Sequence, residues 1–73
     1  MTSAKEIKAR QKAMSITLDL CRSPEISVTV ETAVYRQLLL YTNAEVLACG
    51  TLYNVVGKNL GAGVYKVSLA PAN

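Results

Sequence analysis

The chain contains no histidine, no tryptophan and no phenylalanine, and its only aspartate is Asp19. Without histidine the commonest general base is missing, and so are the Ser-His and Cys-His pairs of nucleophilic catalysis. Two cysteines without histidine also cannot complete the four-ligand shell of a usual zinc site. We therefore expect a protein that is not an enzyme and that uses no metal and no cofactor.

Cysteine and long apolar segments are scarce as well. The chain has two cysteines, Cys21 and Cys49, whereas a typical small secreted domain has four or more. The charged opening lacks the apolar region of a signal peptide, and Arg36 and Glu45 interrupt the longest apolar segment before it reaches the ~18 residues of a membrane span. We expect a cytoplasmic protein with reduced thiols and no membrane partner, a single Cys21–Cys49 bridge being the alternative.

What the sequence does contain is a separation of charge. Residues 1–12 hold four basic residues and one acidic residue, whereas the rest of the chain holds four of each sign, so the whole net charge of +3 lies at one end. The remainder is rich in apolar residues, which make up 51% of the chain and argue against disorder. We divide the chain into a basic arm, residues 1–14, and one small globular domain, residues 15–73.

The arm has the pattern of a short helix over residues 3–14. Ser3 and Glu6 have the spacing of a capping box, and most of the following residues are good helix formers. Only Ile7 and Met14, with Ala4 beside them, offer an apolar side. Such a helix is marginal on its own, so we expect it to become firmer when it binds a partner.

Two alternating segments follow, at residues 15–21 and 25–31. Period-2 alternation around Pro24 predicts an antiparallel hairpin with one buried face. Residues 33–41 favour a helix capped by Thr32, with a third strand over 35–41 as the alternative. Strands are expected at 45–56, bent at Gly50, and at 64–69, with a loop over 58–63 and Pro71 ending the last strand.

This order predicts a small α+β domain with an antiparallel sheet of about four strands, one packed helix and a short basic N-terminal helix. A five-stranded β-barrel is the alternative. The candidate partner-binding residues lie on the arm, where basic side chains steer toward an acidic target and one apolar side chain serves as an anchor. They are Lys5, Ile7, Lys8, Arg10 and Lys12. A second candidate combines Arg36, Lys58 and Lys66 with Tyr53 and Tyr65, a set that could stack nucleic-acid bases if it shared one sheet face.

Two resemblances bear on function. Residues 60–69 are similar to the Gly-x-Tyr-x-Val segment of filamentous-phage single-strand DNA-binding proteins. The length of the chain, its opening Met-Thr-Ser-Ala-Lys-Glu-Ile-Lys-Ala-Arg and its lack of catalytic residues resemble the short phage-encoded proteins that bind bacterial RNA polymerase.

The second resemblance implies a binding protein in the cytoplasm of a bacterial host. Such a protein docks on RNA polymerase, inhibits transcription initiation and causes antitermination. Direct binding of single-stranded nucleic acid, or a structural role in an assembly, is the alternative function.

Overall fold

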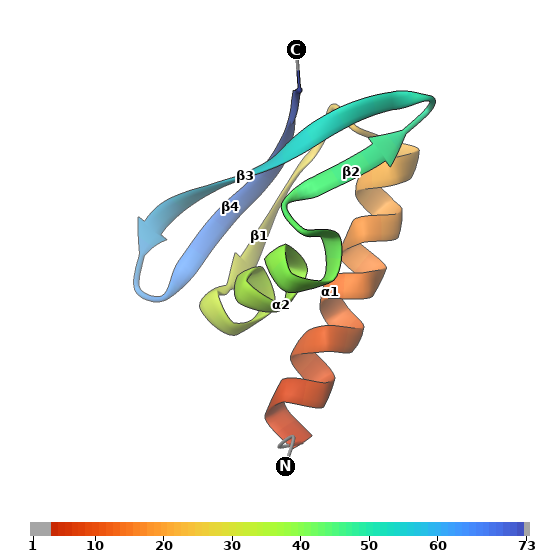
Figure 1. The fold of residues 1–73 in the computed structure, drawn as a ribbon. Helices are drawn as coiled ribbons and strands as arrows, with labels where there is room; N and C mark the ends of the chain where they lie inside the picture. The colour runs from red at the N-terminus through yellow and green to blue at the C-terminus, as the bar shows by residue number, and fades with distance from the viewer. Residues whose placement is uncertain (1–3, 73) are drawn as a thin grey trace.

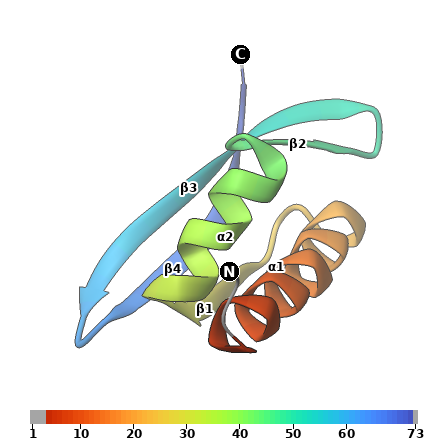
Figure 2. The same ribbon diagram turned by 60° about the horizontal axis from the view of Figure 1, so that its bottom comes forward.

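The computed structural model describes residues 4–72 and confirms a small α+β fold with an open antiparallel sheet of four strands. The sheet order is β1-β4-β3-β2, and both helices lie against one face of it (Figures 1 and 2). In chain order the elements are α1 (Ala4–Arg22), β1 (Ser27–Glu31), α2 (Thr32–Thr42), β2 (Glu45–Ala48), β3 (Thr51–Gly61) and β4 (Val64–Pro71). The β-barrel alternative is wrong, because the sheet is open.

Helix α1 is longer than the sequence pattern indicated. It does not end at residue 14 but continues to Arg22, so the strand predicted over residues 15–21 is wrong. Its buried positions, Ala9, Ala13, Ile16 and Leu20, recur every three or four residues and form a helical stripe. The Thr17 hydroxyl donates a hydrogen bond to the Ala13 carbonyl oxygen at 2.8 Å, so this polar group has a partner within the helix. Ser3, half of the expected capping box, lies outside the described residues.

The hairpin between residues 15–21 and 25–31 is wrong for the same reason, since its first half is helical. Strand β1 pairs instead with β4, with Val28 opposite Val67 and Val30 opposite Tyr65. Pro24 follows the end of α1, and a short turn with a hydrogen bond from Ile26 N to the Ser23 carbonyl oxygen (3.1 Å) leads into β1. The alternation within residues 25–31 reflects the one buried side of β1 and says nothing about which strand pairs with it.

Helix α2 confirms the helical prediction for residues 33–41. Thr32 does not cap it, however: it is the first helical residue, and Glu31 occupies the N-cap position without a side-chain capping bond. The Thr32 hydroxyl and main-chain N–H both donate to the Gly63 carbonyl oxygen, each at 3.0 Å. Thr32 therefore fastens the start of α2 to the turn between β3 and β4.

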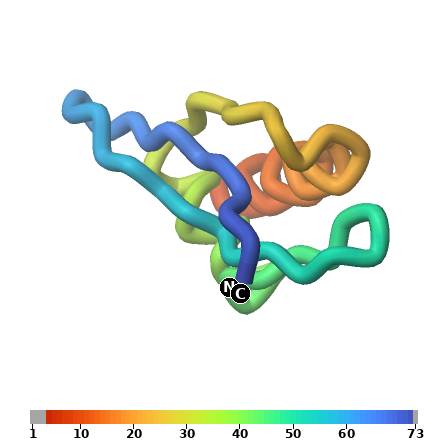
Figure 3. The backbone as a smooth tube through the Cα atoms, turned by 90° about the horizontal axis from the view of Figure 1, so that it is seen from above, coloured from red at the N-terminus to blue at the C-terminus, as the bar shows by residue number. Residues whose placement is uncertain are grey.

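The segment predicted as one bent strand is a hairpin. Cys49 and Gly50 form a two-residue turn between β2 and β3, and both have positive φ angles, 52° and 79°, as a type I′ hairpin requires. Strand β3 continues through most of the predicted 58–63 loop, and the reversal is confined to Ala62 and Gly63. The resulting β3–β4 hairpin extends away from α1 (Figures 1 and 3).

The core lies between the helices and one face of the sheet. It is built from aliphatic side chains, of which Leu20, Leu38 and Val67 are the largest that are fully buried. No polar or charged side chain within residues 4–72 is buried. The other face of the sheet, which no helix covers, carries the side chains that alternate with the buried ones. Residues directly opposite each other on paired strands share a face, so Leu47 lies beside Leu52 there, and Lys58 lies beside Lys66. Leu47, Leu52 and both lysines are exposed there, so this outer face is open to solvent.

Candidate functional site: a basic and apolar helical surface

Three of the predicted basic residues form one row on α1. Lys5, Lys8 and Lys12 are spaced by three and four residues, which makes them neighbours on the helix surface, and all three are exposed. Together they line a shallow cavity of about 210 Å³ whose other wall includes Glu31 and Val34 at the start of α2. The structure thus assembles these three lysines, called the lysine row below, on one side of α1.

Arg10 lies on a different side of α1 from the lysine row. It lines a groove of about 440 Å³ between the two helices, together with Met14 from α1 and with Gln37, Leu40 and Tyr41 from α2. Leu40 is 77% exposed and Tyr41 is 55% exposed, although both carry large apolar surfaces. The groove, called the α1–α2 groove below, combines an arginine, a tyrosine and two long aliphatic side chains. Arginine, tyrosine and methionine are enriched in protein interfaces.

Ile7 lies on the side of α1 that faces away from the core. At 100° per residue, Ile7, Met14 and Leu18 fall on the same side of the helix, opposite the buried stripe that includes Ala13. Met14 is 40% exposed and Leu18 is 61% exposed. These three residues form an exposed apolar stripe on the outward side of α1, and Met14 also lines the α1–α2 groove. Ile7 is thus an exposed apolar side chain on a different side of α1 from the lysine row.

Sequence reasoning missed the part of this surface that comes from α2. Leu40 and Tyr41 are distant from Met14 in the chain, and only the packing of the two helices brings them to one groove. The available signal was the run Leu38, Leu39 and Leu40, because a single amphipathic helix face cannot bury three consecutive leucines. One of the three had to face solvent, and Leu40 does.

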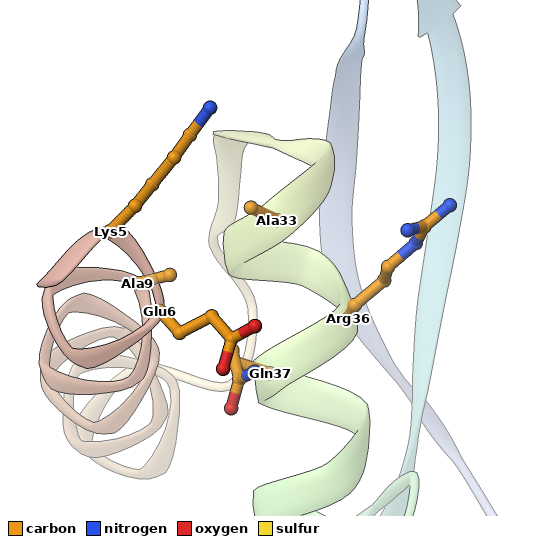
Figure 4. A pocket seen from close by; sticks show the side chains of 6 residues that line it. All are labelled: Lys5, Glu6, Ala9, Ala33, Arg36 and Gln37. Carbon is orange, nitrogen blue, oxygen red and sulfur yellow. The ribbon is translucent and has the colours of Figure 1, made fainter. Parts of the chain in front are cut away.

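A second cavity, of about 250 Å³, lies between α1 and the first turns of α2. Figure 4 shows that the Lys5 and Arg36 side chains extend in roughly the same direction, away from the Glu6 carboxylate, which lies next to Gln37 between the helices. Ala9 and Ala33 line the same cavity. A carboxylate at the centre and cations directed outward do not form a binding site for an anion.

The second predicted set of residues is not assembled. Lys58 and Lys66 are opposite each other in the β3–β4 register, on the outer face of the sheet. Tyr53 is opposite the buried Val46, and Tyr65 stacks on Tyr35 of α2, so both tyrosines belong to the face that carries the helices. The lysines and tyrosines lie on opposite faces of the sheet and therefore do not form a base-stacking platform, and Arg36 belongs to α2.

The described residues also hold no constellation for metal chemistry. No group of three or more cysteine, aspartate or glutamate side chains in residues 4–72 is placed to hold a metal ion. Neither α1 nor α2 is long and apolar enough to cross a membrane. What this region offers a ligand is a surface made of charge and apolar side chains.

Comparison with known proteins identifies no relative of this chain. No protein-family model matches the chain, and no curated protein or solved structure is significantly similar to it.

Proposed function

We propose that the protein is a non-enzymatic binding protein that docks on an acidic surface of a larger host protein complex, with bacterial RNA polymerase as the partner that the resemblance implies. On polymerase, such docking would inhibit initiation and alter termination by occlusion. The observation that carries the proposal is that one helix, α1, carries both the lysine row and an exposed apolar stripe, Ile7, Met14 and Leu18, which meets the α1–α2 groove at Met14.

The lysine row supplies long-range attraction. Three exposed ammonium groups on one side of a helix raise the local potential, and complementary potentials accelerate encounter with an acidic partner and fix its orientation. Charge alone gives little affinity, because exposed ion pairs contribute only about 0–1 kcal/mol each. The exposed apolar side chains of α1 supply the burial that lasting binding requires.

The mixture of basic and apolar side chains favours a protein over a nucleic acid as the partner. Phosphate backbones are bound by cations and polar groups, and bases by exposed aromatic rings. The groove holds the exposed ring of Tyr41, but the larger part of this surface, Ile7, Met14, Leu18 and Leu40, offers neither kind of group. Protein interfaces combine an apolar centre with a charged rim, as this surface does. A standard interface of about 800 Å² per partner would cover about a sixth of the accessible surface, which is 4912 Å².

The test compares two double charge reversals of equal size. In K5E/K8E the lysine row is reversed, whereas in K58E/K66E the same charge change falls on the outer face of the sheet. Both variants and the wild type are titrated against purified RNA polymerase holoenzyme, and each is also assayed in promoter-dependent transcription. Circular dichroism verifies that both remain folded, which is expected because all four lysines are exposed.

We expect K5E/K8E to lose at least tenfold in affinity and to stop inhibiting transcription, with K58E/K66E close to the wild type. Equal losses in the two variants would show that only net charge matters, and an unchanged K5E/K8E would reject the helical surface as the contact. Binding of wild-type protein to free oligonucleotides, weakening steeply with salt and without binding to polymerase, would establish the nucleic-acid alternative instead.

A further inference from the structure

The fold brings the two cysteines of the chain to one place. Cys21 lies in the last turn of α1, and Cys49 lies in the turn between β2 and β3. The Cys49 thiol is 4.0 Å from the Cys21 carbonyl oxygen, and the Cys21 thiol is 3.7 Å from the Leu47 carbonyl oxygen. Each cysteine therefore contacts the segment that carries the other, and Figure 1 shows the β2–β3 turn beside the C-terminal end of α1.

The two thiols differ in accessibility. Cys49 is exposed, whereas Cys21 is half-buried. A two-residue turn holds Cys49 in a left-handed backbone conformation, so the thiol is presented from a fixed point and not from a long mobile loop. An accessible thiol beside a sheltered one is the arrangement in which the first reacts with an oxidant and the second resolves the product.

We propose that Cys21 and Cys49 are a reactive thiol pair that closes into an intramolecular disulfide by exchange with a small-molecule disulfide such as glutathione disulfide. This site is separate from the lysine row. The lysine row lies in the N-terminal half of α1, and the thiol pair lies where α1 ends.

The exchange proceeds in two balanced steps. The Cys49 thiolate attacks one sulfur of glutathione disulfide, which forms a mixed disulfide at Cys49 and releases one glutathione thiolate. The Cys21 thiol then leaves the Leu47 carbonyl oxygen, loses its proton to solvent and attacks the Cys49 sulfur. That attack breaks the mixed disulfide and releases a second glutathione thiolate. The protein loses two electrons and two protons, and glutathione disulfide gains them as two thiols.

The bond would fasten the end of α1 to the β2–β3 hairpin. It would close a loop that contains β1, α2 and β2, and a cross-link over a loop of this kind restricts the unfolded chain more than the folded one. The oxidised protein should therefore unfold at a higher temperature than the reduced protein.

Intact-mass spectrometry after incubation with glutathione disulfide tests the proposal, with C21S and C49S as matched controls. Wild-type protein should lose the mass of two hydrogens and remain monomeric, at a rate that does not depend on protein concentration. C21S should stop at one glutathione adduct, located on Cys49 by peptide mapping, and C49S should react more slowly. Reduced, both serine variants should have the far-ultraviolet spectrum of the wild type.

Three outcomes would overturn the proposal. Wild-type protein could keep stable adducts on both cysteines, could form disulfide-linked dimers in place of the internal bond, or could retain both thiols under conditions that modify C21S. An oxidised monomer whose midpoint of thermal unfolding is not above that of the reduced form would contradict the cross-link between α1 and the hairpin.

Discussion

Tyr35 of α2 stacks on Tyr65 of β4, with ring centroids 4.4 Å apart and ring planes inclined by 17°. The Tyr35 ring also lies directly over Gly57 of β3, where a Cβ atom would collide with the ring carbons and the hydroxyl. Gly57 is opposite Val67 in the β3–β4 register, and Val67 is fully buried. The missing side chain at position 57 is what allows the ring to lie against the sheet.

Gly57→Ala should therefore destabilise the protein by about 1–3 kcal/mol, because the added methyl group overpacks the contact with Tyr35. Urea unfolding measures the change in the free energy of unfolding. Tyr35→Leu removes the ring atoms that the new Cβ would meet, so the penalty of Gly57→Ala should shrink in that background. An equal penalty in both backgrounds would mean that the cost comes from the backbone of β3 and not from the ring.

The full length of α1 can be tested with two leucines that are two residues apart. Leu20 is fully buried and Leu18 is 61% exposed. Leu20→Ala should lower the free energy of unfolding by about 2–5 kcal/mol through the cavity it leaves, whereas Leu18→Ala should change it by about 0.5 kcal/mol or less. Were residues 15–21 a strand, both side chains would share a face and both substitutions would be costly. Chemical denaturation of the two variants distinguishes a helix from a strand over residues 15–21.

The sequence-based error in this region has a physical cause. Ile16, Leu18 and Leu20 satisfy the period of a strand, while Ile16 and Leu20 with Ala9 and Ala13 satisfy the period of a helix. The helical pattern is easy to overlook because two of its four members are alanines, whose small side chains carry a weak hydropathy signal. Helix α2 was predictable because residues 36–40 are a helix-forming run without clean alternation, and strand β4 was predictable because a glycine-containing turn precedes its alternating residues.

Leu40 and Leu47 provide a matched test of where a partner binds. Both are strongly exposed leucines, but Leu40 lines the α1–α2 groove and Leu47 lies on the outer face of the sheet. Under the proposed docking on RNA polymerase, Leu40→Gln should weaken binding by about tenfold, as the loss of a buried anchor costing about 1.4 kcal/mol would, while Leu47→Gln should leave it unchanged. Isothermal titration calorimetry with each variant measures both. A loss for Leu47→Gln alone would move the contact to the sheet.

The opposed lysines on the outer face predict a dependence on salt. Lys58 and Lys66 are directly opposite in the register of β3 and β4, and like charges in that position are destabilising by about 0.2–1 kcal/mol. Lys66→Glu should raise the midpoint of thermal unfolding at low ionic strength, and the difference from wild type should shrink as sodium chloride screens the pair. Lys66→Gln should give an intermediate value. A Lys66→Glu variant that melts below the wild type would show that the lysines do not repel each other in the fold.

The candidate site was predictable only where it depends on a single segment. Lys5, Lys8 and Lys12 are spaced as neighbours on any helix, so their row follows from the sequence. The same spacing places Arg10 on a different side of the helix. The α1–α2 groove that Arg10 lines, however, depends on the packing of two helices. The meeting of Cys21 with Cys49 likewise requires both the extension of α1 to Arg22 and the reversal at Gly50.

The position of β4 between β1 and β3 determines when the sheet can form during synthesis. Strand β1 leaves the ribosome before α2, β2 and β3, yet its only neighbour in the sheet is β4, the latest of the four strands to emerge. Until Val67 has been added, the backbone groups of Val28 and Val30 have no strand to pair with, because their partners in β4 have not yet been synthesised. A chain cut short before Val64 should therefore be an unfolded substrate for cellular proteases, and not a smaller version of the same domain.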